Sequence, residues 1–138
     1  MTFDRSTATA QEAADSVGCE LGQIVKTLIF MADGRPTVVL AAGDGQVDTG
    51  KLARLVGVGR KRLKMGKPDE VAALTGFEIG GVSPVGMSQV HDVVLDESLQ
   101  RFEQIWAAAG TSSSVFESTP AELADKLNGQ WADIIRSV

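Results

Sequence analysis

The stretch GQIVKTLIFMADGRPTVVLAA, residues 22–42, decides the fold class of this chain of 138 residues. Residues 23–31 and 37–42 are rich in β-branched and other apolar side chains, which favours two β-strands. The dipeptide Asp33-Gly34 between them is typical of a tight hairpin turn, because both residue types accept a positive φ. The sequence therefore predicts an antiparallel β-hairpin.

Lys26 stands on an otherwise apolar face of the first strand, since period-two alternation places it with Leu28 and Phe30. One interpretation is that its alkyl stem covers the core while the ammonium reaches water. The other is a lysine at the wall of a cleft, where a cation binds an anion or a developing negative charge with little competition from water. The pattern alone leaves both interpretations open.

Caps, glycines and hydrophobic spacing indicate further elements on both sides of the hairpin. Thr9 and Thr119 are candidate N-caps, each with a glutamate three residues later. Helices are expected over residues 8–17, 50–56, 70–75, 99–109 and from 120 onward. Strands are expected over residues 61–65, 77–82 and 90–95, with strand or loop over 111–118 and a last strand or turn over 131–138.

These elements intermix without the regular alternation of a doubly wound parallel sheet, which predicts the α+β class. At this length the chain can form one core but not two independent ones. We expect a single domain over residues 1–138, with a mixed, curved, barrel-like sheet flanked by helices and residues 1–8 as a flexible N-terminal arm.

Charge is unevenly distributed along the chain. Thirteen Lys and Arg residues oppose 18 Asp and Glu residues, for a formal net charge of −5. The segment KLARLVGVGRKRLKMGK, residues 51–67, contains seven of the cations and no acid. A basic segment on an acidic chain either contacts a phosphate backbone or forms an ordinary solvated face.

Several function classes are disfavoured by composition. The chain has one cysteine, Cys19, and one histidine, His91, too few for an internal disulfide or a Cys/His zinc site. The flanks of His91 lack the Gly-x-Ser-x-Gly pattern that would favour a catalytic triad. The longest apolar runs are about five residues, against the roughly 20 that cross a bilayer. With no secretory signal visible, a cytoplasmic protein is expected.

The loop GGVSPVG, residues 80–86, is a second candidate position for chemistry. Adjacent glycines permit close backbone approach, and Pro84 stiffens the loop. Such a loop aims backbone amides at an oxyanion in some enzymes and forms a plain tight turn in many other proteins, so this pattern also leaves two interpretations.

Four motifs occur together in a familiar order: GQIVKTLIF at 22–30, GDGQVDTGKL at 43–52, LTGFEIGGVSPVG at 74–86 and VVLDESL at 93–99. On these motifs the chain resembles the YbaK/EbsC family, free-standing relatives of the editing domain inserted in bacterial prolyl-tRNA synthetase. The resemblance covers roughly residues 10–138.

The resemblance implies trans-editing, which is hydrolysis of the ester that joins a wrong amino acid to the 3′-terminal adenosine of a tRNA, without metal or organic cofactor. Lys26 matches the family's lysine, and Gly80 and Pro84 match its Gly-x-x-x-Pro loop. Lys26, Gly80 and Gly81 are therefore the expected catalytic residues. The expected substrate-binding residues are Thr27, Ser83, Pro84 and Asp96, and the expected tRNA-binding residues are Arg60, Lys61, Arg62, Lys64 and Lys67.

The expected substrate is a mischarged tRNA, Cys-tRNA(Pro) or Ala-tRNA(Pro). The expected partners are the tRNA acceptor end carrying a noncognate amino acid and prolyl-tRNA synthetase, with neither DNA nor a membrane among them. The alternative is a non-catalytic module that captures an amino-acid-like ligand or docks on a synthetase. A different hydrolase that uses Lys26 on another ester or amide is disfavoured, because no independent nucleophile and base pair is visible.

Overall fold

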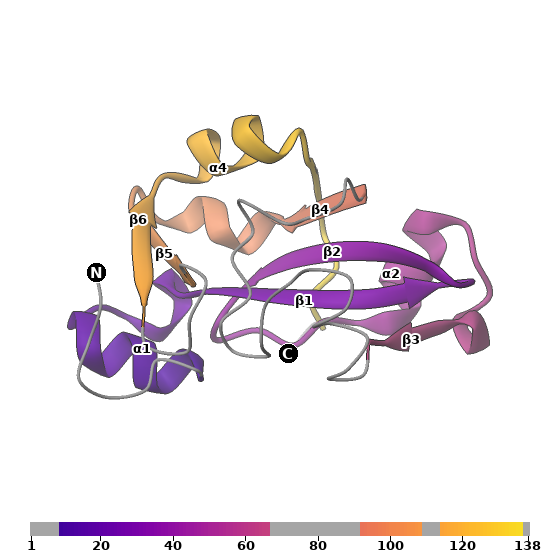
Figure 1. The fold of residues 1–138 in the computed structure, drawn as a ribbon, viewed down its shortest axis with the longest axis horizontal. Helices are drawn as coiled ribbons and strands as arrows, with labels where there is room; N and C mark the ends of the chain where they lie inside the picture. The colour runs from indigo at the N-terminus through magenta and orange to yellow at the C-terminus, as the bar shows by residue number, and fades with distance from the viewer. Residues whose placement is uncertain (1–8, 67–91, 109–113, 137–138) are drawn as a thin grey trace.

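The predicted hairpin lies at the centre of the sheet in the computed structural model, which describes residues 9–66, 92–108 and 114–136 (Figure 1). Strands β1 (Val25–Ala32) and β2 (Arg35–Ala42) pair antiparallel along their whole length. Asp33 and Gly34 have φ values of 52° and 82°. Two positive φ values give a two-residue loop the twist of its flanking strands. The hairpin prediction is confirmed.

Three more strands complete a mixed sheet with the order β3-β1-β2-β4-β7. β3 (Leu63–Met65) is antiparallel to β1, β4 (Asp92–Asp96) is parallel to β2, and β7 (Gln130–Ala132) is parallel to β4. The α+β class with a mixed sheet is therefore confirmed. Among the described strands the sheet has two free edges, β3 and β7, so closure into a barrel stays a prediction.

Strands β5 (Ile105–Ala108) and β6 (Val115–Ser118) form a separate antiparallel pair (Figure 1). The pair lies beside the N-terminal end of β1, where Ile24 and Trp106 form a parallel bridge. The strand-or-loop prediction over residues 111–118 is thus resolved as strand over its last four residues.

In the described part of the chain, three α-helices flank the strands: α1 (Ala10–Val17), α2 (Thr49–Val56) and α4 (Pro120–Leu127). Thr9 and Thr119 each accept a hydrogen bond from the backbone N–H three residues later, as predicted. Asp48 caps α2 by accepting from the amides of Gly50 and Lys51. Short-range capping signals were therefore sufficient to locate these three helices.

The helix predicted over residues 99–109 is wrong. A short 3₁₀ turn, η3 (Glu97–Arg101), occupies its start, and strand β5 follows. Ile105 and Ala107 are buried whereas Trp106 is half-buried, which is the period of a strand. The apolar spacing fits a helix as well as a turn followed by a strand, and pairing with β6 later in the chain decides for the strand.

Two apolar layers pack on the two faces of the hairpin. Alternate residues of β1 enter different layers, Val25 and Ile29 in one, Phe30 and Ala32 in the other. The first layer also contains Val38, Leu40, Leu95, Leu99 and Leu123. The second also contains Val39, Leu52, Val94 and Ile134. Each large side chain buried in this way contributes about 1.5–3 kcal/mol, so both layers fix the strand that carries Lys26.

Other predicted elements are confirmed in part or lie outside the described residues. The strand predicted over residues 61–65 begins at Leu63, after a 3₁₀ turn, η2 (Arg60–Arg62). The helix at 70–75, the strand at 77–82 and the arm at 1–8 fall outside the described ranges. Within the residues that the structure describes, no helix is long and apolar enough to cross a membrane.

Candidate functional site

Lys26 leaves β1 on the face that carries Leu28 and Phe30, as the alternation predicted. Its side chain is half-buried, and its Nζ donates a 2.5 Å hydrogen bond to the carbonyl oxygen of Gly45. Burial lowers the pKa of the Lys26 ammonium from its ordinary value of 10.5, and the Asp44 carboxylate opposes part of that shift. The protein therefore holds this ammonium in place, and its other N–H groups, which have no hydrogen bond to the described residues, can bind an anion or a developing negative charge.

The loop of residues 43–48, between β2 and α2, supplies the partner of Lys26. The Gly45 N–H donates to the carbonyl of the last β2 residue at 3.0 Å, so the loop turns back directly after the strand. Asp44 forms an ion pair with Arg101 of η3, with 2.9 Å between Oδ1 and Nη2. The loop that carries the lysine's acceptor is therefore tied to a second element.

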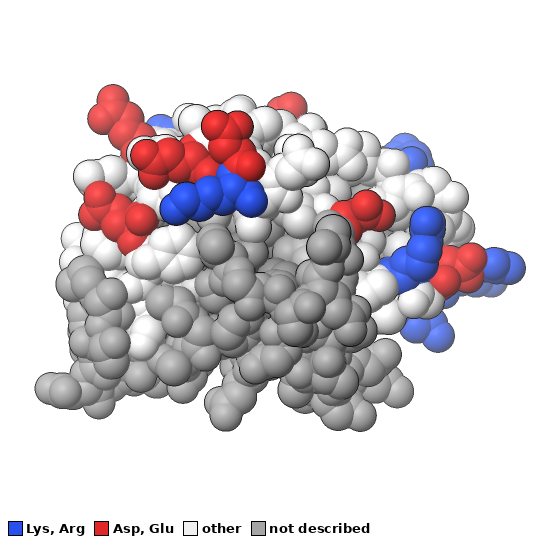
Figure 2. All heavy atoms as spheres, turned by 45° about the horizontal axis from the view of Figure 1, so that its top comes forward, with Lys and Arg blue, Asp and Glu red and all other residues white. Residues whose placement is uncertain are grey.

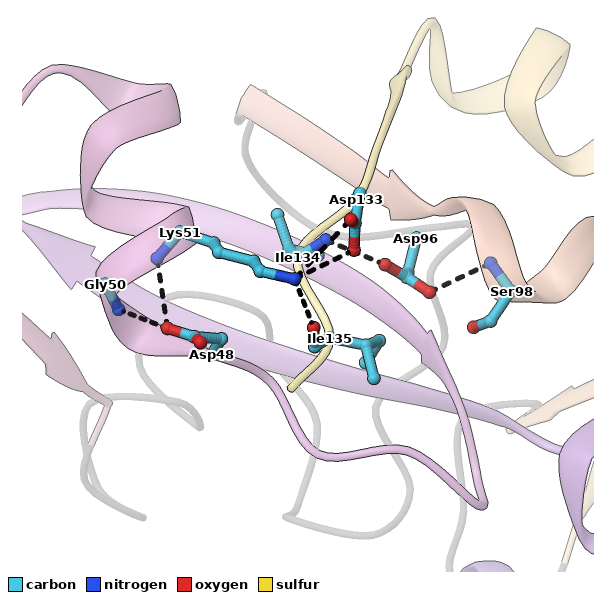
Figure 3. A network of polar contacts seen from close by, with 8 residues as sticks. All are labelled: Asp48, Gly50, Lys51, Asp96, Ser98, Asp133, Ile134 and Ile135. Atoms are coloured by element: carbon cyan, nitrogen blue, oxygen red, sulfur yellow. Dashed lines mark hydrogen bonds and ion pairs between the residues drawn. The ribbon is translucent and has the colours of Figure 1, made fainter. Parts of the chain in front are cut away.

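A C-terminal segment, residues 133–136, packs against the same loop (Figure 3). The carbonyl of Ile134 accepts from the Asp48 N–H at 2.7 Å, and the Arg136 N–H donates to the Gln46 carbonyl at 2.8 Å. The side chain of Ile135 lies against Gly45, where an added Cβ would meet it at 3.1 Å. The segment thus covers the residue that accepts the Lys26 hydrogen bond.

Lys51 of α2 fixes the C-terminal segment from the other side (Figure 3). Its Nζ donates to the Ile135 carbonyl at 2.8 Å and lies 3.3 Å from Oδ1 of Asp133. This lysine belongs to the basic stretch at residues 51–67, but its ammonium is engaged within the fold. It is therefore not a free cation for a phosphate ligand.

Asp96 lies at the end of β4 in the cross-strand row of Lys26, two strands away. At a strand spacing of about 4.8 Å, the two Cα atoms are about 10 Å apart. Asp96 is 2% exposed, and its two carboxylate oxygens accept from the N–H groups of Ser98 and Ile134, each at 2.9 Å (Figure 3). The carboxylate therefore holds η3 and the C-terminal segment, and its predicted substrate contact stays a prediction.

Thr27 follows Lys26 in β1 and faces the opposite side of the sheet, toward the layer of Val25 and Ile29. Its Oγ1 is buried and has no hydrogen-bond partner in the described part of the chain. Burying a hydroxyl without a partner costs free energy. The orphaned hydroxyl is compatible with the predicted contact to a substrate, which stays a prediction.

The basic cluster consists of Arg60, Lys61, Arg62 and Lys64, and all four side chains are exposed. Figure 2 shows Lys and Arg gathered at the right-hand end of the molecule, where Figure 1 places α2 and β3, with acidic side chains mostly toward the other end. Arg62 pairs with Asp33 at 3.3 Å, but an ion pair this exposed contributes little stability. The cluster is thus open to a polyanion, and its predicted role in tRNA binding stays a prediction.

Cys19 follows Gly18, the C-cap of α1, and is half-buried. Burial raises the pKa of its thiol. A thiol in this state is a poor nucleophile, because the thiolate is the reactive form. The arrangement gives no support to cysteine catalysis.

The remaining predicted site residues lie outside the described ranges. They are Lys67, Gly80, Gly81, Ser83 and Pro84. The structure therefore places Lys26, the loop of residues 43–48 and Asp96 on one side of the sheet. The predicted oxyanion loop at residues 80–86 is known from the sequence alone.

Sequence reasoning missed three residues that set the site: Gly45, Arg101 and Arg136. Gly45 is signalled by the Gly-Asp-Gly turn, whose close contact with Ile135 explains the second glycine. Arg101 and Arg136 carry no local signal, because their partners Asp44 and Gln46 lie 57 and 90 positions away.

Comparison with known proteins agrees with this fold. The protein YwhH of Bacillus subtilis (strain 168) is 37% identical over 136 residues, which cover 97% of this chain and 85% of the relative. The "Putative Cys-tRNA(Pro)/Cys-tRNA(Cys) deacylase EbsC" of Enterococcus faecalis (strain ATCC 700802 / V583) is 33% identical over 127 residues, covering 91% and 76% of the two chains. A solved structure described as "a putative trans-editing enzyme for prolyl tRNA synthetase" superposes with a TM-score of 0.92 at 42% identity, covering 99% and 85%.

The chain belongs to the family of aminoacyl-tRNA editing domains, whose model matches residues 4–126. Within that family it is of the YbaK/EbsC type. The resemblance inferred from the four sequence motifs is therefore confirmed.

Proposed function

We propose that this protein is a trans-editing deacylase that hydrolyses the ester of a mischarged tRNA, with Cys-tRNA(Pro) or Ala-tRNA(Pro) as substrate. The observation that carries the proposal is the half-buried Lys26 ammonium, held at 2.5 Å by the Gly45 carbonyl within an aminoacyl-tRNA editing domain. The relative named as a Cys-tRNA(Pro)/Cys-tRNA(Cys) deacylase supports the choice of substrate class.

The reaction needs little beyond positioning and charge. The oxygen of water attacks the ester carbonyl carbon, the bond from that carbon to the ribose oxygen breaks, and the proton from water passes to the ribose oxygen. The products are the free amino acid and a tRNA with its terminal hydroxyl restored. An ester is already an activated acyl group, so stabilising the tetrahedral oxyanion supplies much of the rate.

Lys26 has the properties this role requires. Its ammonium is partly withdrawn from water, which strengthens its attraction for a negative oxygen. In our proposal it binds the scissile ester or the terminal phosphate, while the amides of Gly80 and Gly81 face the ester carbonyl. Thr27, Ser83, Pro84 and Asp96 are the proposed substrate-binding residues, with Asp96 on the Lys26 side of the sheet and Thr27 on the opposite side.

The basic cluster is the proposed contact for the acceptor stem, together with Lys67. A local cationic surface on a chain with a net charge of −5 binds a polyanion at one place only. The proposed location is the cytoplasm, where charged tRNA and prolyl-tRNA synthetase are found, and the synthetase is the proposed protein partner.

The direct test is deacylation of tRNA(Pro) charged with Cys, Ala, Ser or Pro, with wild type and Lys26→Ala side by side. We expect the wild type to release one noncognate amino acid. The rate of release should be at least about 100-fold lower in Lys26→Ala, which is the usual effect of losing one oxyanion-stabilising donor. Lys126→Ala, which truncates an exposed lysine of α4, is the matched control.

Two results would overturn the proposal in different ways. Turnover by Lys26→Ala near the wild-type rate would remove the lysine from the mechanism. Survival of all four esters would favour the non-catalytic module instead, and binding of free amino acids to the wild type would then be the measurement that supports it.

A further inference from the structure

A cavity of about 480 Å³ lies beside the loop that carries the Lys26 partner. Its walls are Asp48, Thr49 and Gly50 at the start of α2, Arg60 of η2, and Arg136 of the C-terminal segment. The cavity therefore joins three elements that are far apart in the sequence. Two of its five lining residues are arginines.

The two arginines are the charged donors among the described lining residues of this cavity. Arg60 forms no ion pair with any described residue, and the contact of the Arg136 guanidinium is a 3.5 Å hydrogen bond to the Gln46 side chain. A guanidinium presents several N–H donors in a plane that matches the oxygens of a phosphate. Thr49 adds a hydroxyl at the same wall.

The α2 amides add nothing to this site, because Asp48 already accepts from Gly50 and Lys51. Both bonds use Oδ1 of Asp48, and together with the charges of Lys51 and Arg136 they lower the pKa of this carboxylate. Among the described lining residues, two guanidinium groups against one carboxylate give one net positive charge, which suits a singly charged phosphodiester.

The backbone of Arg136 is fixed before any ligand arrives. Its N–H donates to Gln46, and the preceding residues are held by Asp48, Lys51 and Asp96. A side chain on an ordered backbone loses less freedom on binding than one on a free terminus. The lysine and this arginine also bond to consecutive residues of one loop, Gly45 and Gln46.

We propose that the cavity between Arg60 and Arg136 binds a phosphodiester group of the RNA substrate, next to the end that carries the amino acid. This inference rests on the proposed function and adds Arg136 to it. The two guanidinium groups hold the phosphate, and the shared loop sets the distance between that phosphate and the ester at Lys26.

The test compares two substrates that differ in phosphodiesters: a charged acceptor-stem minihelix and the same amino acid esterified to adenosine. For Arg136→Gln and Arg60→Gln we expect the ratio of kcat/KM for the minihelix over the adenosine ester to fall about tenfold, through KM for the minihelix. The slope of log Kd for the minihelix against log salt concentration should fall by about one for each substitution, which corresponds to one released ion. Lys126→Gln is the charge-matched control on α4.

Each other outcome is decisive. An unchanged ratio in both arginine variants would overturn the phosphate site, as would an equal loss on both substrates, since that acts through the fold or through Lys26. If the wild type hydrolyses neither substrate, the proposed function fails. The phosphate site is then tested by Kd for the uncharged minihelix. Equal Kd values for wild type, Arg136→Gln and Lys126→Gln would then overturn it.

Discussion

Lys26 and Thr27 are neighbours in β1, yet they depart from opposite faces of the sheet and meet different surroundings. The lysine finds an acceptor in Gly45, whereas the Thr27 hydroxyl has no partner among the described residues. Alternation in the sequence was enough to predict the two faces. It was not enough to predict the acceptor, because Gly45 lies in a loop whose position depends on packing against residue 135.

The Thr27 hydroxyl provides the first prediction. Thr27→Val removes a buried polar atom with little change in shape, so the free energy of unfolding should rise by about 1 kcal/mol. Urea denaturation measures this rise. In parallel, kcat/KM for deacylation should fall in Thr27→Val and recover in Thr27→Ser, which keeps the hydroxyl. Lower stability of the valine variant would mean that the hydroxyl has a partner in the fold.

The second prediction concerns the pH dependence that Lys26 creates. Burial lowers the pKa of this ammonium in the folded protein, so the unfolded chain binds the proton more tightly. The charge therefore costs stability below the lowered pKa, and this cost disappears as pH rises through the lowered pKa toward 10.5. The free energy of unfolding of the wild type, relative to Lys26→Met, should rise across this range.

Denaturation of both proteins from neutral pH to pH 10.5 checks this dependence. Lys126→Met controls for the loss of a lysine as such. A difference between wild type and Lys26→Met that stays constant or falls with pH would contradict the burial of the ammonium.

At the scale of elements, success or failure of the sequence predictions follows the range of the interactions. The hairpin and the three capped helices depend on neighbours a few residues away, such as Asp33 with Gly34 and Thr119 with Glu122, and all are confirmed. Residues 105–108 depend on pairing with residues 115–118, and there a helix was predicted in error. Asp96 caps η3 through the nearby Ser98 N–H, whereas its second bond, from the Ile134 N–H, spans 38 positions and has no local signal in the sequence.

The third prediction tests the close approach of β7 to β4. A Cβ at Gly129, directly before β7, would clash with Cδ1 of Leu95 and lie 3.1 Å from Cγ1 of Val93. Leu95 is completely buried in the core, so moving its side chain aside would disturb the packing of its neighbours. Gly129→Ala should therefore lower the free energy of unfolding by about 1–3 kcal/mol, the usual cost of overpacking, as measured by urea denaturation.

Gly59→Ala is the matched control for that substitution. Gly59 has a φ of −66°, and a Cβ there would meet no atom of the described residues within 4 Å. Its stability should stay within about 0.5 kcal/mol of wild type. Equal losses in the two variants would show that the contact with Leu95 is not the cause.

On the scale of the whole molecule, charge is separated in space as well as in sequence. The basic cluster occupies one end, whereas acids dominate the other end in the view of Figure 2. The sequence predicted this segregation correctly as a run of seven cations. It did not predict that the Lys51 ammonium would bond to the Ile135 carbonyl or that Arg136 would lie with Arg60 at one cavity. Both facts depend on where the C-terminal segment packs.

The fourth prediction reverses the charge of this end. Arg60, Lys61 and Arg62 substituted together by Glu should weaken tRNA binding at least about tenfold and reduce the salt dependence by about three ions. Filter binding or fluorescence titration over a range of salt concentrations measures both quantities. Lys126→Glu makes the same change of charge at one site in α4 and should leave both unchanged. A triple variant with the affinity and salt slope of wild type would reduce the cluster to a solvated surface.

The packing of residues 133–136 on residues 44–51 has a consequence for the timing of maturation. The ribosome makes a chain from its N-terminus, so the contact that joins positions 46 and 136 can form only after residue 136 has been made. The hairpin and α2 therefore precede the contacts that complete them. A nascent chain that ends before residue 133 already carries Lys26 but lacks the contacts that cover its acceptor loop, so the arrangement around Lys26 is completed only after residues 133–136 have been made.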